Sequence, residues 1–148
     1  MQNHIVDILQ DNRPSIYLYG SFTLNDFKLG WSDIDILCLT ENSITDEQAN
    51  RLLTLRQELA EEFMGNKYFR SFEGGILTLN TFINNLPDRV VYWGSSGQRI
   101  TNTYYFDSFC MAELIDSGIL LHAKISEINC NIQQRSSSRP MLFITLMQ

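Results

Sequence analysis

The chain has 148 residues, of which 44% are hydrophobic and 19% charged, so it can form one compact domain with a real core but is too short for two ordinary domains. Its formal net charge of −6 argues against a broad binding surface for nucleic acid. We expect a cytoplasmic protein without membrane association, because the sequence has no basic and apolar leader and no apolar run of about 18 residues.

The first predicted elements are a helix, a strand and a glycine turn. Apolar residues at helical spacing predict a helix that begins near Ile5 and ends by Pro14. Bulky residues over 16–19 predict a strand, which Gly20-Ser21 breaks. We expect residues 22–27 to begin a helix whose free N–H groups form an anion site. Gly20 would let the backbone approach a phosphate closely, and the Ser21 hydroxyl lies beside it.

A pair of aspartates follows a ten-residue spacer, in the sequence Ser32-Asp33-Ile34-Asp35. It opens an apolar strand, and because side chains alternate along a strand, Asp33 and Asp35 should project from one face and Ile34 from the other. The simplest interpretation is a solvated strand entrance. At a buried strand, however, two carboxylates roughly 4 to 6 Å apart would repel each other by about 3 to 4 kcal/mol at an effective dielectric near 20. Magnesium, which prefers oxygen ligands, is the expected counter-ion.

Lys28 lies in the spacer before the aspartates. It could touch phosphates, or it could be a solvated loop lysine. Further along, Thr45 and Gln48 have the spacing of a capping box and begin a predicted helix. The apolar stripe of that helix extends to Met64, and Gly65 should end it.

The segment 72–79 predicts a buried strand that carries an acidic residue, Glu73, near its start. Glu73 could be a carboxylate bonded to a turn at the strand end. Alternatively, a strand placed beside the aspartate strand would bring Glu73 to the same cluster. Gly74 and Gly75 weaken a strand but permit close approach by a ligand or by neighbouring backbone.

The remaining sequence predicts a short apolar run over 90–93, a loop at 94–97, and a helix that ends near Gly118. Residues 119–121 either add a strand or pack the chain down. A further helix is predicted over 124–134, and we expect a tail of uncertain structure over 135–148. The apolar part of that tail either adds to an edge of the domain or pairs with another chain.

His122 has no companion residue at metal-ligand spacing and is predicted to be structural. The three cysteines lack metal or redox spacing and are predicted to be reduced thiols: Cys38, Cys110 and Cys130.

Taken together, Gly20-Ser21, the Asp33-Ile34-Asp35 triplet and Glu73 resemble the nucleotidyltransferase superfamily that includes DNA polymerase beta. The amino-acid sequence around the first two motifs is most similar to that of the bacterial aminoglycoside adenylyltransferases that act on streptomycin and spectinomycin. The resemblance covers about residues 15 to 122. The sequence departs from those enzymes at Gly74-Gly75, and after Glu127, where they have a C-terminal helical domain that helps bind the drug.

The resemblance implies an α/β (α+β) nucleotidyltransferase fold over residues 1–134, with helices packed on a mixed β-sheet. It implies that Asp33, Asp35 and Glu73 are catalytic residues that hold two Mg²⁺ ions. ATP or another nucleoside triphosphate would be the substrate, and a hydroxyl of a small acceptor would receive the nucleoside monophosphate. Four residues are implied to bind the nucleotide: Gly20, Ser21, Lys28 and Ser32.

Two other interpretations stay open. The chain is about as short as the minimal nucleotidyltransferase antitoxins, which act on a partner toxin protein. One alternative is therefore a protein that acts on or binds a protein partner. A degenerate domain that binds nucleotide without turnover is the other. A second copy of the chain could also complete the acceptor site as a homodimer.

Overall fold

The structure is a computed structural model that describes residues 1–123. The predicted helix over 124–134, the domain boundary after residue 134, the apolar tail and Cys130 lie outside the described residues.

Four α-helices and six strands account for most of the described chain, and short 3-10 helices join several of them. The α-helices are α1 (Gln2–Leu9), α2 (Asp46–Glu62), α3 (Leu79–Asn84) and α4 (Ser108–Ser117). The strands are β1 (Ser15–Tyr19), β2 (Ile34–Thr40), β3 (Phe72–Thr78), β4 (Val90–Gly94), β5 (Gly97–Thr101) and β6 (Ile119–His122). The 3-10 helices are η1 (Gln10–Asn12), η2 (Gly20–Phe22) and η3 (Lys67–Ser71).

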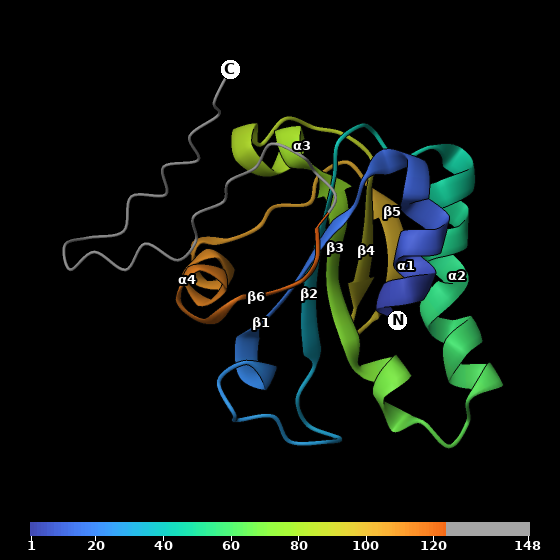
Figure 1. Ribbon diagram of the computed structural model, residues 1–148, viewed down its shortest axis with the longest axis vertical. Helices are drawn as coiled ribbons and strands as arrows, with labels where there is room; N and C mark the ends of the chain where they lie inside the picture. Colours follow the sequence, from blue (N-terminus) through green and yellow to red (C-terminus); the bar gives the residue numbers. More distant parts are fainter. Residues whose placement is uncertain (124–148) are drawn as a thin grey trace.

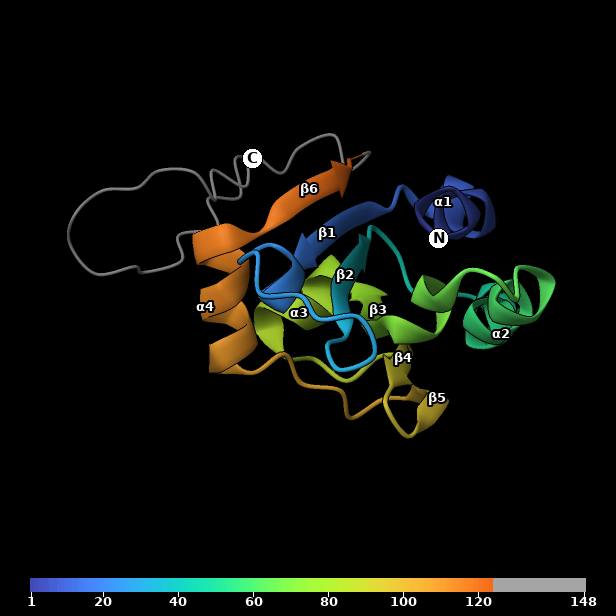
Figure 2. The same ribbon diagram turned by 90° about the horizontal axis from the view of Figure 1, so that it is seen from below.

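The strands form one mixed sheet in the order β5-β4-β3-β2-β1-β6. Only β2 and β3 pair in parallel, and every other neighbouring pair is antiparallel. Figures 1 and 2 show α1 and α2 on one face of the sheet and α3 and α4 on the other. The expected mixed sheet with helices packed against it is therefore confirmed, and residues 119–122 add a strand at its edge.

Alternation along the central strands sorts their side chains between two cores. Ile34, Ile36 and Cys38 of β2 pack with Leu52 under α1 and α2. On the opposite face, Leu37 and other apolar side chains pack with Leu114 of α4. Asp35 lies between Ile34 and Ile36 in sequence, so it shares the face of Leu37, as the sequence predicted. The carboxylate side of the sheet is thus the side that α3 and α4 cover.

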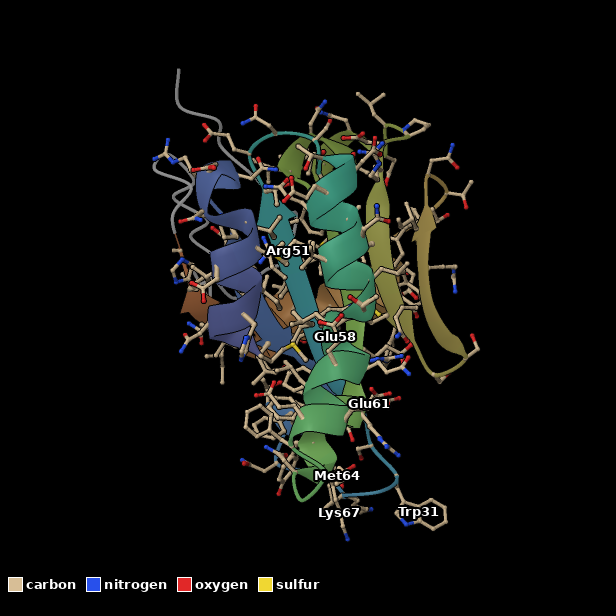
Figure 3. All side chains as sticks on the ribbon, turned by 90° about the vertical axis from the view of Figure 1, so that its right-hand side faces the viewer. Trp31, Arg51, Glu58, Glu61, Met64 and Lys67 are labelled. Carbon is tan, nitrogen blue, oxygen red and sulfur yellow. The ribbon has the colours of Figure 1, made fainter. Side chains whose placement is uncertain are left out.

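The capping box of α2 is confirmed. The Thr45 hydroxyl accepts a hydrogen bond from the Gln48 amide, and the Gln48 side chain accepts one from the Thr45 amide, both at 3.1 Å. Leu52 and Leu59 are buried as predicted. Met64 follows the helix and is 86% exposed, so the apolar stripe ends before it. Figure 3 shows the polar side of α2, with Arg51, Glu58 and Glu61 directed away from the sheet.

One local prediction is wrong, and one strand was not predicted. No helix forms over residues 22–27, because the chain closes a 3-10 turn instead: the amides of Thr23 and Leu24 both donate to the Gly20 carbonyl. Asn25 then adopts a left-handed φ of 57°, which an α-helix does not tolerate. The predicted loop at 94–97 is the tight turn of a hairpin, and its second strand, β5, was not predicted.

Candidate active site

Gly20 places the end of β1 directly against a carboxylate. Tyr19 is the register partner of Asp35 in the antiparallel pair of β1 and β2, and Gly20 follows with a φ of +72°. A Cβ added at Gly20 would overlap the Asp35 carboxylate oxygen Oδ2. Position 20 therefore requires glycine for two reasons: its backbone is left-handed, and the Asp35 side chain occupies the space that a Cβ would need.

Asp35 and Glu73 face each other across the parallel pair of strands. They are register partners in β2 and β3, so both side chains leave the same face of the sheet at neighbouring positions. The next pair explains the first unusual glycine: a Cβ at Gly74 would overlap the backbone carbonyl of Ile36. The prediction that glycine permits close approach of neighbouring backbone here is confirmed.

The charged groups near Asp35 are mostly acidic. Asp33 precedes β2 and is exposed, whereas Asp35 is half-buried. Burial, followed by the charges of Glu73, Asp33 and Glu113, raises the pKa of Asp35 to about 7. Glu113 comes from α4 and was missed by sequence reasoning, since its spacing to the other carboxylates carries no recognisable pattern.

Tyr92 of β4 is a second residue that the sequence did not reveal. Its hydroxyl donates a hydrogen bond of 2.7 Å to Glu73 Oε1. Burial raises the pKa of Glu73, and the Asp33 carboxyl raises it further, whereas the Tyr92 hydroxyl and the Arg56 guanidinium lower it. Alternation along residues 90–93 places the side chains of Tyr92 and Trp93 on opposite faces of the sheet. Only the pairing of β3 with β4, however, shows that Tyr92 reaches Glu73.

Arg56 of α2 is a buried cation whose charge acts on this cluster. Its guanidinium donates to the Phe72 carbonyl at 2.8 Å, to the Gly94 carbonyl at 3.1 Å and to the Gln98 side chain at 2.7 Å. Its charge also acts on Glu73 and Asp33. Arg56 thus ties the start of β3 to the β4–β5 hairpin and partly balances the acidic side chains. It was hidden within the polar positions of a predicted amphipathic helix.

The other three predicted nucleotide-binding residues lie in the turns that connect Gly20 with Asp33. Ser21 is half-buried in η2, and its carbonyl accepts from the Asp26 amide at 3.1 Å. The Ser32 hydroxyl accepts from the Lys28 amide at 3.1 Å and so closes the turn before Asp33. The Lys28 ammonium lies 3.6 Å from Asp26 and is largely exposed. The structure therefore gathers Gly20, Asp35 and Glu73, while Lys28 and Ser32 shape the approach to Asp33.

The carboxylates fit a divalent cation in donor chemistry and in charge. Hard oxygen donors suit Mg²⁺, and Asp35 and Glu73 carry unfavourable charge that a cation would relieve. Within residues 1–123, no group of three or more His, Cys, Asp or Glu side chains is already arranged as a metal-ligand set. Waters and substrate phosphates usually complete the shell of a bound Mg²⁺ ion, so two or three carboxylates from the protein suffice.

Comparison with known proteins supports the same superfamily. The family described as nucleotidyltransferase domain matches residues 3–69, which include Gly20, Asp33 and Asp35 but end before Glu73. The match supports the nucleotidyltransferase superfamily and, in general terms, a nucleotidyl transfer activity. The mixed six-stranded sheet with its helices is consistent with that fold. Neither the curated proteins nor the solved structures that were searched gave a match. Among residues 1–123, no helix is both long and apolar enough to cross a membrane.

Proposed function

We propose that the protein transfers a nucleoside monophosphate, AMP from ATP, to a hydroxyl of a small acceptor such as an aminoglycoside. The observation that carries this proposal is the pairing of Asp35 with Glu73 across β2 and β3, with the Gly20 backbone against Asp35. A glycine turn beside paired carboxylates supplies both a place for phosphates and a place for Mg²⁺.

Each group has a distinct role in the proposed reaction. The backbone at Gly20 and the Ser21 hydroxyl receive the distal phosphates, because backbone N–H and hydroxyl groups donate hydrogen bonds to phosphate oxygens. Asp33, Asp35 and Glu73 would hold Mg²⁺, which when bound offsets the charge of the carboxylates and of the triphosphate. Glu73 accepts the proton of the acceptor hydroxyl. The acceptor oxygen forms a bond to the α-phosphorus while the bond to pyrophosphate breaks.

The proposal is tested by magnesium-dependent release of pyrophosphate from ATP in the presence of streptomycin, spectinomycin and further aminoglycosides. We expect release with at least one acceptor and none from the variant Asp33→Asn/Asp35→Asn. A matched control is Asp26→Asn, an exposed aspartate in the same connecting segment, which should retain activity. Equal release by the double variant and the wild type would exclude the assigned site.

A second candidate function is action on a partner protein, as in the minimal nucleotidyltransferase antitoxins. The observation that favours it is the exposure of apolar side chains on α4 and β6, where Phe109 is 70% exposed and Ile119 and Leu120 are about half exposed, at 49% and 51%. Large apolar side chains that are exposed to solvent are common at protein contacts.

The two functions differ in what becomes labelled. With ATP labelled in the adenine ring, a small acceptor would carry the label into the low-molecular-weight fraction. Label that follows a co-purifying polypeptide, and that is lost in Phe109→Ser, would favour the protein acceptor. Equal labelling of that polypeptide by Phe109→Ser would count against Phe109 as part of its contact.

A further inference from the structure

We propose that Tyr92 is a positioning residue that fixes the Glu73 carboxylate, so that Oε1 is held by the protein and Oε2 is presented to the site. This inference rests on the proposed function, in which Glu73 takes part in metal binding and proton transfer. It concerns a residue that lies outside the matched family region and outside the Asp-x-Asp motif.

The hydrogen bond itself is short and directional. The Tyr92 hydroxyl lies 2.7 Å from Glu73 Oε1, which is a short distance within the usual range for a hydroxyl hydrogen bond. A carboxylate with one oxygen engaged in this way loses most of its freedom to rotate, because rotation would break the bond. The remaining oxygen then points in one direction rather than in several.

The ring that carries this hydroxyl is held by two neighbours. The Arg99 guanidinium carbon lies 4.5 Å from the centre of the Tyr92 ring, and Arg99 is the register partner of Tyr92 on β5. The Tyr104 ring lies 5.3 Å from the Tyr92 ring, centre to centre. A cation over a ring face and a tilted aromatic pair are both favourable contacts. They restrict the tyrosine, and through it the carboxylate.

Gly75 makes room for this arrangement. A Cβ at Gly75 would lie 2.7 Å from the Tyr104 ring, so a larger residue there would displace Tyr104. Gly75 is the register partner of Tyr92 and lies two residues after Glu73 on the same face of β3. The second unusual glycine of the Gly74-Gly75 pair is thus explained by the space that the Tyr104 ring needs beside Tyr92.

The test compares Tyr92→Phe with Tyr104→Phe in the full chain. Both substitutions remove one hydroxyl from the same aromatic pair, but among the described residues only the Tyr92 hydroxyl bonds to Glu73. Mn²⁺ is titrated in the presence of α,β-methylene-ATP, with bound ion measured by loss of the electron paramagnetic resonance signal of free Mn²⁺. We expect Tyr92→Phe to weaken Mn²⁺ binding by about tenfold and Tyr104→Phe by less than about twofold. Equal effects of the two variants would overturn the proposal.

A second measurement needs neither metal nor turnover. Urea unfolding of Tyr92→Phe, Glu73→Ala and the double variant in EDTA forms a double-mutant cycle. Because Tyr92 acts through Glu73, Tyr92→Phe should change the unfolding equilibrium constant less when Glu73 is absent. We expect the fold-change that it causes to be smaller by a factor of about five or more in the Glu73→Ala background than in the wild type. Additive effects would overturn the positioning role. If the wild type fails to bind Mn²⁺, the metal site of the proposed function is refuted, and this cycle alone decides whether Tyr92 positions Glu73.

Discussion

Removing the charge of Asp35 should stabilise the metal-free protein, and the gain should depend on pH. Burial, then the neighbouring Glu73 and Asp33 charges, raises the pKa of Asp35 from 3.8 to about 7 in the folded protein. The folded state therefore keeps its proton at pH values where the unfolded chain has lost it. The free energy of unfolding of the wild type consequently falls as pH rises from about 4 through about 7. Asparagine has no such charge and escapes this penalty.

The size of the effect follows from the pKa. The change from 3.8 to about 7 would correspond to about 4 kcal/mol if Asp35 were fully shielded from solvent. Asp35 is only half-buried, so solvent screening reduces the figure to about 1 to 2 kcal/mol. We therefore expect Asp35→Asn to exceed the wild type by about 1 to 2 kcal/mol at pH 8 and by about 0.5 kcal/mol or less at pH 4.5.

Urea unfolding in EDTA at pH 4.5 and pH 8, followed by circular dichroism, measures this difference. Asp7→Asn provides the control, because Asp7 is an exposed aspartate of α1 and its substitution should change stability by less than about 0.5 kcal/mol at either pH. A stabilisation of equal size at both pH values, or a less stable Asp35→Asn at pH 8, would refute the reasoning.

Three further predictions follow from the site and the fold. Gly20→Ala should destabilise the protein by about 2 to 3 kcal/mol and abolish ATP binding in calorimetry, whereas Gly30→Ala, at a left-handed φ with open space, should cost only about 1 kcal/mol and retain binding. Equal losses of binding would contradict the contact with Asp35. Mg²⁺ should raise the thermal unfolding midpoint of the wild type at pH 8 and have a smaller effect on Asp35→Asn. A rise of the same size in both would place the ion elsewhere. Thr45→Ala should cost about 1 kcal/mol in thermal unfolding, through loss of the α2 cap, without changing ATP binding.

The sequence predicted the parts of the fold that rest on local patterns. The capping residues Thr45 and Gln48, and the alternation around Asp35, depend on neighbours a few positions away, and the structure confirms both. The helix expected over 22–27 did not form, because the Gly20 carbonyl accepts the amides of Thr23 and Leu24 in a tighter turn. The spacing between Gly20-Ser21 and the two aspartates did not indicate that competing turn.

The part of the site that sequence could not supply depends on which strands pair. Glu73 was recognised as a candidate, and its place opposite Asp35 follows from the parallel pairing of β2 and β3. Tyr92 and Arg56 reach Glu73 or its neighbour from a different strand and from a helix. Their distances along the sequence obey no period, so only the folded arrangement brings them to the carboxylates.

The most direct test of the central claim follows the α-phosphate of ATP. The protein is incubated with Mg²⁺, an aminoglycoside panel and ATP labelled either at the α- or at the γ-phosphorus, and the acceptor fraction is counted. The proposed function predicts label on the acceptor from the α-position only, release of the γ-label as pyrophosphate, and loss of both in Asp33→Asn/Asp35→Asn. Label that reaches the acceptor from the γ-position, or transfer that persists in the double variant, would contradict it.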